Sequence, residues 1–216
     1  MALPSAPPAQ FNFAQFLIAA NNSRKDKTAL IDDVGSLTYG EMGDQIRACA
    51  AGLRKLGLKR EERVLLLMQD STDWVVSFLG ALYAGVVPVA VNTLLTADDY
   101  AFMINNSRAQ AALVSSALLG TLNAAIAQGT KSIKHVVVSR HEGDLPAPNL
   151  HFKDLLASAA GPSLPAETHA DEPAFWLFSS GSTGNPKGTV HTQGNLYWTA
   201  QLYGKGVLAL TSNDVV

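Results

Sequence analysis

The chain has 216 residues, a net charge of −2, 47% apolar residues and 16% charged residues. This composition is typical of a globular protein, and the near-neutral charge excludes the basic surface expected of a nucleic-acid-binding protein or a polybasic membrane anchor. No segment approaches the ~18 consecutive apolar residues of a transmembrane helix, and the N-terminus lacks the features of a signal peptide. Cys49 is the single cysteine, so no internal disulfide can form. We therefore expect a cytoplasmic protein that contacts neither membrane nor nucleic acid.

Helical and extended patterns alternate from the first third of the chain onward. Residues 41–56 carry apolar side chains at helical spacing, and Gly57 follows them, where left-handed dihedrals end a helix. Residues 63–68 form a continuous apolar run, which is typical of a buried parallel strand. Ser71 or Thr72 is then placed to cap the next helix.

The same rhythm continues through the middle of the chain. The capped helix is predicted to end at Gly85, and Pro88 indicates that the next strand is an edge strand or begins there. The elements that follow are a strand at residues 87–91, a helix from Thr96, a strand at 111–114, a helix at 118–127 and a strand at 135–139. This βαβ alternation predicts an α/β fold, a mostly parallel sheet flanked by helices on both faces.

The most informative segment is the loop at residues 179–188, Ser-Ser-Gly-Ser-Thr-Gly-Asn-Pro-Lys-Gly. It follows a short aromatic run at residues 174–178 that is typical of a buried strand, and it precedes a second β-prone run at 189–192. Glycines leave backbone N–H groups open to a ligand, hydroxyls add donors, and a lysine ammonium suits phosphate oxygens. The segment therefore predicts a polyphosphate-binding loop.

Two other interpretations of this loop were weighed. A Walker A loop requires a second glycine five residues after Gly181 and a Ser or Thr after the lysine, but the chain has Pro186 and Gly188 at those positions, so we reject it. A flexible linker remains the simplest alternative, because runs of Gly and Ser are usually linkers. A linker is not expected between two β-prone segments.

The loop resembles the signature loop of the adenylate-forming superfamily, which includes acyl-CoA synthetases, aryl-CoA ligases, luciferases and peptide-synthetase adenylation domains. Residues 37–41 (LTYGE), 78–89 (FLGALYAGVVPV), 91–95 (VNTLL) and 106–109 (NSRA) also resemble family motifs, in the expected order. Within the family, residues 190–192 and 195–205 are similar to benzoate-type aryl-CoA ligases.

The resemblance implies a fold like the first part of the large N-terminal domain of these enzymes. Residues 1–172 would form the first α/β subdomain, and residues 173–216 would begin the second, which carries the signature loop. Family members are more than twice as long as this chain, so the resemblance implies the N-terminal part of a ligase. We expect the 216 residues alone to be inactive.

The resemblance also implies an activity for the parent enzyme. A carboxylic acid would react with the Mg²⁺ complex of ATP to give an acyl-adenylate, and CoA would then displace AMP. The similarity to benzoate-type ligases implies that the acid is benzoate or a related aryl acid. The residues assigned to the ATP phosphates are Ser179, Ser180, Gly181, Ser182, Thr183, Gly184 and Lys187, with Lys187 as the catalytic residue and no protein metal ligand. A homodimer is a further expectation.

Two alternatives to this function stay open. One is a ligase for fatty or other acyl acids, since the residues that would choose the acid lie beyond Val216. The other, of a different class, is a non-catalytic nucleotide-binding or protein-interaction module.

Several other residues are interpreted as structural. Cys49 lies on the apolar face of its helix and is expected to be buried and unreactive. His191 either lines the substrate cleft or packs beside its strand. Many family members carry a histidine six residues after the lysine, where this chain has Gln193. The aromatic residues near the loop are expected to pack in the core: Trp176, Phe178, Tyr197 and Trp198. The remaining histidines have no metal-type spacing and are expected to be solvent-exposed or structural: His135, His141, His151 and His169.

Overall fold

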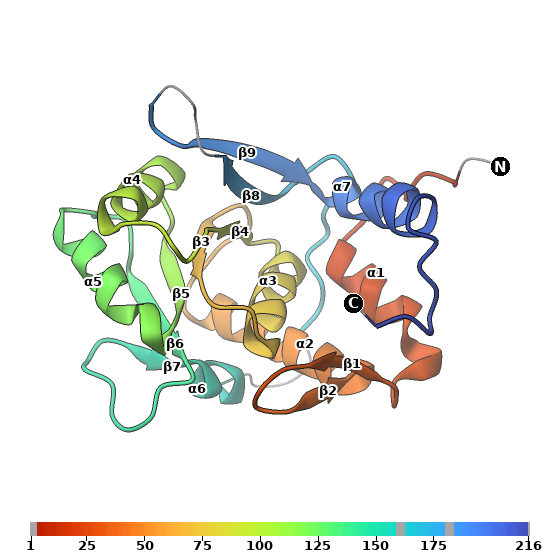
Figure 1. The fold of residues 1–216 in the computed structure, drawn as a ribbon, viewed down its shortest axis with the longest axis horizontal. Coiled ribbons are helices and arrows are strands. Elements are labelled where there is room, and N and C mark those ends of the chain that lie inside the picture. Colours follow the sequence, from red (N-terminus) through yellow and green to blue (C-terminus); the bar gives the residue numbers. More distant parts are fainter. Residues whose placement is uncertain (1–3, 159–162, 180–183, 216) are drawn as a thin grey trace.

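The computed structural model describes residues 4–158, 163–179 and 184–215. Within them a seven-stranded sheet has the order β7-β6-β5-β3-β4-β8-β9, and a separate hairpin pairs β1 with β2 (Figure 1). The strands of the large sheet are β3 (Arg63–Leu67), β4 (Val87–Ala90), β5 (Ala111–Ser115), β6 (His135–Ser139), β7 (Leu150–His151), β8 (Pro173–Ser179) and β9 (Lys187–Thr192). All neighbours in it are parallel except β8 and β9. The predicted α/β fold with a mostly parallel sheet is confirmed.

Helices cover both faces of this sheet. The helices are α1 (Phe13–Ala20), α2 (Tyr39–Lys55), α3 (Thr72–Ala84), α4 (Ala97–Ser107), α5 (Leu119–Ala127), α6 (Phe152–Ala157) and α7 (Gln193–Trp198). Short 3₁₀ turns occur at η1 (Asn22–Arg24) and η2 (Ser116–Leu118), and α7 continues into the π-helical turn η3 (Thr199–Lys205). The small hairpin is formed by β1 (Thr28–Ile31) and β2 (Ser36–Thr38), and it lies beside α2 at the bottom of Figure 1.

The alternation of side chains along β3 divides the core into two layers. Val64 and Leu66 pack with α1, α2, α3 and α6, whereas Leu65 and Leu67 pack with α4 and α5 on the opposite face. All four side chains are fully buried. Because successive strand residues point to opposite faces, a continuous apolar run is what a strand between two helical layers requires.

Local capping explains where the helices begin and end. Ser71 accepts a hydrogen bond from the Trp74 N–H and caps α3, while Gly85 ends that helix with a φ of 78°. Thr96 and Asp99 form a capping box at the start of α4, which begins where the helix from Thr96 is predicted. Helix α2 begins two residues before the predicted start, because Thr38 and Glu41 form a second capping box.

The structure decides between the two interpretations of Pro88. Pro88 indicated an edge strand as one possibility, but β4 lies inside the sheet between β3 and β8. The alternative, a proline where the strand begins, is confirmed. Strand β4 pairs with β8 only from Val89 onward, so Pro88 needs no N–H on the side that faces β8.

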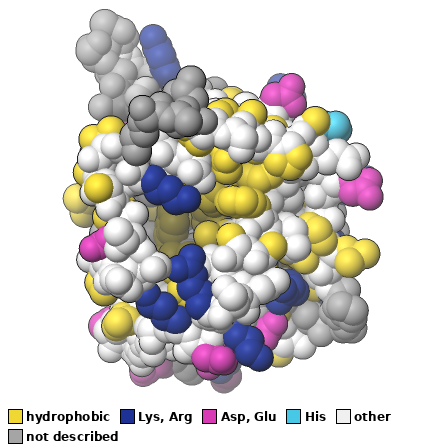
Figure 2. Space-filling view, turned by 90° about the vertical axis from the view of Figure 1, so that its right-hand side faces the viewer, with side chains coloured by type: hydrophobic (Ala, Val, Ile, Leu, Met, Phe, Trp, Pro, Cys, Tyr) yellow, Lys and Arg dark blue, Asp and Glu magenta, His cyan; other side chains and the backbone are white. Residues whose placement is uncertain are grey.

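The N-terminal segment and α7 lie together at one end of the molecule, at the right of Figure 1. Figure 2 shows that side, where apolar side chains gather in a hollow and Lys or Arg side chains lie beside it. Exposed apolar residues of these segments include Phe16, Leu202 and Tyr203. Among the helices of the described residues, none combines the length and apolar character needed to cross a membrane.

Candidate phosphate-binding site

The β8–β9 hairpin carries both ends of the predicted phosphate loop. Ser179, the last residue of β8, pairs with Lys187, the first residue of β9, and its hydroxyl donates to the Lys187 carbonyl at 3.5 Å. Ser179, Gly184 and Lys187 are all exposed to solvent. Ser180, Gly181, Ser182 and Thr183 lie outside the described residues, so their assignment to the phosphates stays a prediction.

Glycine is needed at two positions of the loop, for a different physical reason at each. Gly184 has a φ of 136°, a backbone conformation that side-chain-bearing residues rarely adopt. Gly188 lies directly across from Phe178, and a Cβ there would be 3.3 Å from the Trp176 ring and 3.6 Å from the Phe178 ring. The aromatic residues of β8 therefore require a small residue beside Lys187.

The end of β8, from which the loop continues, lies beside a crevice. Since β8 runs parallel to β4 and β4 runs parallel to β3, their carboxyl ends reach the same edge, where ligands bind in open α/β sheets. A crevice of about 370 Å³ opens there, beside Phe178. It is lined by Met68, Asp70, Trp74, Ala90, Val91, Asn92, Thr93, Leu177 and Phe178.

One wall of the crevice is held by a buried tyrosine that the sequence analysis did not single out. The Tyr100 hydroxyl donates to the Asn92 carbonyl at 2.7 Å and accepts the Leu95 N–H at 3.2 Å. Burial raises the pKa of Tyr100, so the phenol stays protonated and keeps its donor. A tyrosine among the apolar residues of α4, four residues after its cap, is the sequence signal that would have identified it.

His191 is half-buried beside its strand, and Gln193 is buried in the fold. The His191 ring stacks on Phe175 with centroids 4.6 Å apart, and its Nδ1 lies 3.3 Å from the Asn195 amide nitrogen. Gln193 is 1% exposed, and its Oε1 accepts the Phe13 N–H at 2.9 Å, which joins α7 to α1. Of the two interpretations of His191, packing beside its strand agrees with the structure.

Cys49 and the aromatic residues expected in the core are buried or partly buried, whereas His169 is exposed to solvent. Cys49 is fully buried, and burial raises the pKa of its thiol to about 12. Trp176 and Phe178 pack against the α4–α5 layer. His141 and His151 have ring centroids 5.9 Å apart, yet the described residues contain no group of three or more His, Cys, Asp or Glu side chains that could hold a metal.

The segment between β8 and β9 follows the carboxyl end of a parallel strand, and ligands of open α/β sheets bind at that edge. The AMP-binding enzyme family matches residues 17–216. The chain belongs to this family.

Similar proteins act on aromatic acids. The benzoate–CoA ligase of Thauera aromatica is 42% identical over 97% of this chain, and the 4-hydroxybenzoate–CoA/benzoate–CoA ligase of Rhodopseudomonas palustris is 36% identical over 97%. These alignments cover 39% and 38% of the two ligases, so the chain spans about two fifths of the length of the curated relatives that it matches.

Solved structures agree with the sequence relatives. A benzoate CoA ligase from Burkholderia xenovorans LB400 is 46% identical with a TM-score of 0.84, over 94% of this chain and 39% of that one. The anthranilate CoA ligase AuaEII, solved with anthranoyl-AMP, is 30% identical with a TM-score of 0.91, over 96% of this chain and 40% of that one.

Proposed function

We propose that these residues are the ATP-phosphate-binding portion of an AMP-forming carboxylate–CoA ligase that acts on benzoate or a related aryl acid. The observation that carries the proposal is the position of Ser179, Gly184 and Lys187 at the carboxyl edge of the sheet, in a chain 42% identical to a benzoate–CoA ligase. The division into subdomains at residue 172 remains a prediction, although β8 pairs with β4 in the same sheet.

The proposed reaction has two steps. A carboxylate oxygen attacks the α-phosphorus of ATP, a new O–P bond forms, and the bond to pyrophosphate breaks. The CoA sulfur then attacks the acyl carbon, the bond to AMP breaks, and the thiol proton is lost to solvent. No protein base is needed for the first step, because a carboxylic acid is already ionised at neutral pH.

Lys187 and the loop donors would act on the departing pyrophosphate. Negative charge increases on the β-phosphate as the bond to the α-phosphorus breaks, and a preorganised cation and N–H groups stabilise that charge without reorganisation. Lys187 lies on a strand paired to β8, so its backbone position is fixed relative to Ser179. We assign Ser180, Gly181, Ser182 and Thr183 to the same phosphates.

Mg²⁺ would enter as the ATP complex. The described residues offer no cluster of three or more metal-ligating side chains, and Mg²⁺ commonly binds through substrate phosphates with only one or two carboxylates. We further propose that the protein works in the cytoplasm and that it forms a homodimer.

Other functions have weaker support. A fatty-acid or short-chain acyl ligase is the second candidate, because a long-chain-fatty-acid–CoA ligase of Mycobacterium tuberculosis is 30% identical and an acetyl-coenzyme A synthetase of Xylella fastidiosa is 29% identical. A non-catalytic nucleotide-binding module is the third, and it would bind ATP without any exchange of pyrophosphate.

ATP–pyrophosphate exchange distinguishes these possibilities. We expect a protein that joins these residues to the remaining part of its relatives' length to exchange labelled pyrophosphate into ATP with benzoate, at least tenfold faster than with palmitate or acetate. Faster exchange with palmitate or acetate would establish the second candidate, and binding of ATP without exchange under any acid would establish the third. The 216-residue chain alone is the negative control, and turnover by it would contradict our expectation that it is inactive.

A further inference from the structure

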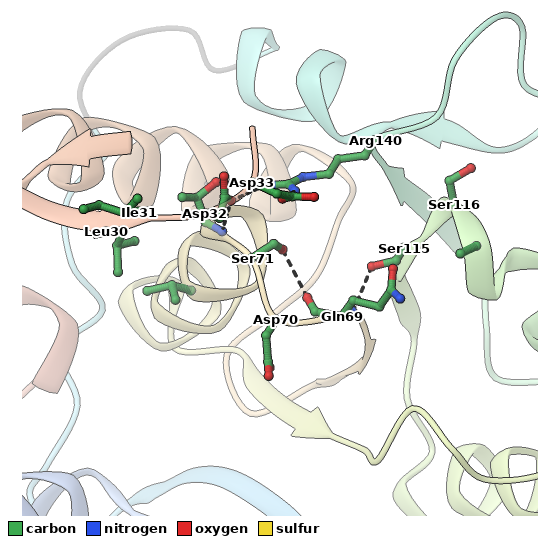
Figure 3. Close-up of a pocket in the computed structure, with 13 residues that line it drawn as sticks. Leu30, Ile31, Asp32, Asp33, Gln69, Asp70, Ser71, Ser115, Ser116 and Arg140 are labelled. Carbon is green, nitrogen blue, oxygen red and sulfur yellow. Dashed lines mark hydrogen bonds and ion pairs between the residues drawn. The ribbon is translucent and has the colours of Figure 1, made fainter. Parts of the chain in front are cut away.

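Arg140 joins separate elements beside a crevice of about 880 Å³ between the ends of β3 and β5 (Figure 3). Its guanidinium pairs with Asp32 through Nη2 and with Asp33 through Nη1 at 3.0 Å. The Thr72 N–H at the start of α3 donates to Asp32 at 2.8 Å. These paired groups hold the β1–β2 hairpin, β6 and α3 together. A buried contact of Gln193 has a comparable effect on the strand that begins with Lys187.

Strand β9 needs support beyond its own strand pairing. Among the described residues it pairs with β8 alone, and its first four residues are exposed to solvent. A strand with one paired edge and little buried surface has low local stability. Strand β9 begins at Lys187 and leads directly into α7, whose first residue is Gln193. The contacts of Gln193 therefore fix the end of β9 that lies opposite to Lys187.

Gln193 ties this end of β9 to the rest of the fold. Its buried side chain accepts a hydrogen bond from the N–H of Phe13, the first residue of α1. The N–H groups in the first turn of a helix have no partner within the helix, so Gln193 satisfies one of them. The Gln193 N–H donates to the Glu172 carbonyl at 3.1 Å, and the Gly194 N–H donates to the Ala170 carbonyl at 2.7 Å.

Helix α1 is a fixed support for this contact. The Asn12 side-chain amide donates to the Leu82 carbonyl of α3 at 2.9 Å, and α3 packs on the sheet. Just before α1, the Phe11 N–H donates to the Thr168 carbonyl and the Thr168 hydroxyl donates to the Phe11 carbonyl, both at 2.8 Å. The hydrogen bond of Gln193 therefore connects β9 to the helical layer that covers the sheet.

We propose that Gln193 is a positioning residue for Lys187. Its side chain holds β9 against α1, and β9 in turn holds Lys187 at the carboxyl edge of the sheet. Without this hydrogen bond, β9 moves relative to α1, and fewer molecules present Lys187 to the phosphates. The apparent affinity for ATP falls in proportion to that fraction. The inference rests on the proposed function, because it takes ATP as the ligand of Lys187.

Two substitutions separate the hydrogen bond from the packing of the side chain. Methionine has about the length of glutamine but only a weak acceptor, so Gln193→Met leaves the Phe13 N–H unpaired. Glutamate keeps an acceptor oxygen, and the positive end of α1 favours its charge, so Gln193→Glu should behave as the wild type. Gln128→Met is the matched control, because Gln128 is an exposed glutamine at the end of α5.

Spin-label distances measure the position of β9 directly. Cys49 is fully buried, so labels attach to the introduced cysteines of Thr189→Cys on β9 and Asn123→Cys on α5, both at exposed positions. Double electron–electron resonance should give a narrow distance distribution in the wild-type, Gln193→Glu and Gln128→Met backgrounds. In Gln193→Met the distribution should be at least twice as wide. Equal widths in all backgrounds, or a Gln193→Glu distribution as wide as that of Gln193→Met, would overturn the proposal.

Kinetics of the proposed reaction complete the test. In a protein that joins these residues to the remaining part of its relatives' length, Gln193→Met should raise KM for ATP at least fivefold and leave KM for benzoate within twofold. A smaller amount of folded protein would lower the apparent kcat without changing either KM. A wider distance distribution with an unchanged KM for ATP would refute a role in the reaction. If the wild type exchanges no pyrophosphate, the proposed function fails, and the distances still decide whether Gln193 fixes β9.

Discussion

At the scale of single residues, Lys187 is the side chain on which the proposed chemistry depends most. It is exposed, it begins β9, and its backbone is paired with Ser179 at the end of β8. Its position therefore comes from the strand pairing rather than from contacts of its own side chain.

Replacing Lys187 should affect the first half-reaction. We expect Lys187→Ala to slow ATP–pyrophosphate exchange about 10²- to 10³-fold, the usual loss for one preorganised donor, with little change in carboxylate binding. Lys131→Ala, at another exposed lysine, is the matched control. A defect confined to thioester formation, with exchange unchanged, would contradict the role assigned to Lys187.

Asp32 is the residue whose ionisation should matter most for stability. The Thr72 N–H, and then the Arg140 guanidinium, hold the pKa of Asp32 well below its usual range. A carboxyl group whose pKa is lowered by folding stabilises the protein above the unfolded pKa of about 3.9, and that contribution is lost as the pH falls below it.

We expect Asp32→Asn to be about 1–3 kcal/mol less stable than the wild type at pH 7, because Arg140 loses a charged partner. The difference should shrink as the pH falls from 5 toward 2. Urea unfolding over this range measures it, with Asp26→Asn as a control that should follow the wild type. A constant difference at every pH would show that the charge of Asp32 is not the cause.

At the scale of elements, the contact between α2 and α3 is one of the tight points of the helical layer. A Cβ on Gly80 would lie 2.7 Å from both Cβ and Sγ of Cys49, and 3.3 Å from the Ile46 carbonyl oxygen. The helices approach this closely only because Gly80 has no side chain. Cys49 is buried by the same contact, which explains its protected thiol.

Gly80→Ala should therefore destabilise the protein by about 1–3 kcal/mol through overpacking, despite the better helix propensity of alanine. Gly120→Ala in α5 is the control, since nothing lies within 4 Å of the added Cβ, and we expect it to be neutral or stabilising by up to ~1 kcal/mol. Thermal or urea unfolding compares the two. Equal effects of both substitutions would mean that the α2–α3 contact can relax.

At the scale of the whole molecule, stability should decrease from the centre of the sheet toward β9. Strand β3 pairs on both sides and is almost wholly buried, whereas β9 pairs only with β8 and is mostly exposed. We expect the amides of Leu65, Leu66 and Leu113 to exchange only through global unfolding, and those of β9 to exchange at least 100-fold faster. Native-state hydrogen exchange measures both, and equal protection would show that β9 belongs to the same cooperative unit.

The sequence by itself determined the strands and helices between residues 41 and 139 and the two strands β8 and β9, and it predicted a phosphate loop between them. It did not predict α1, the β1–β2 hairpin, β7, α6 or α7. The sequence signals of these elements and of the loop are local. They are a capping side chain that accepts a hydrogen bond from an N–H three residues later, an apolar run as long as a strand, and glycines and hydroxyls gathered within ten residues. Helix α2 begins two residues before the start that its apolar pattern predicts, because the capping box at Thr38 and Glu41 fixes its first turn. Such contacts depend on neighbours along the chain, so a single sequence reveals them.

Only the tertiary structure decided the order of the strands and the crevices beside β3. The sequence predicted β4 to be a strand, but its position inside the sheet depends on β8, which begins more than 80 residues later. Arg140 and Asp32 lie 108 residues apart and meet only because β6 and the β1–β2 hairpin reach the same edge. Contacts of this kind depend on how the layers pack, and no pattern along the chain specifies them.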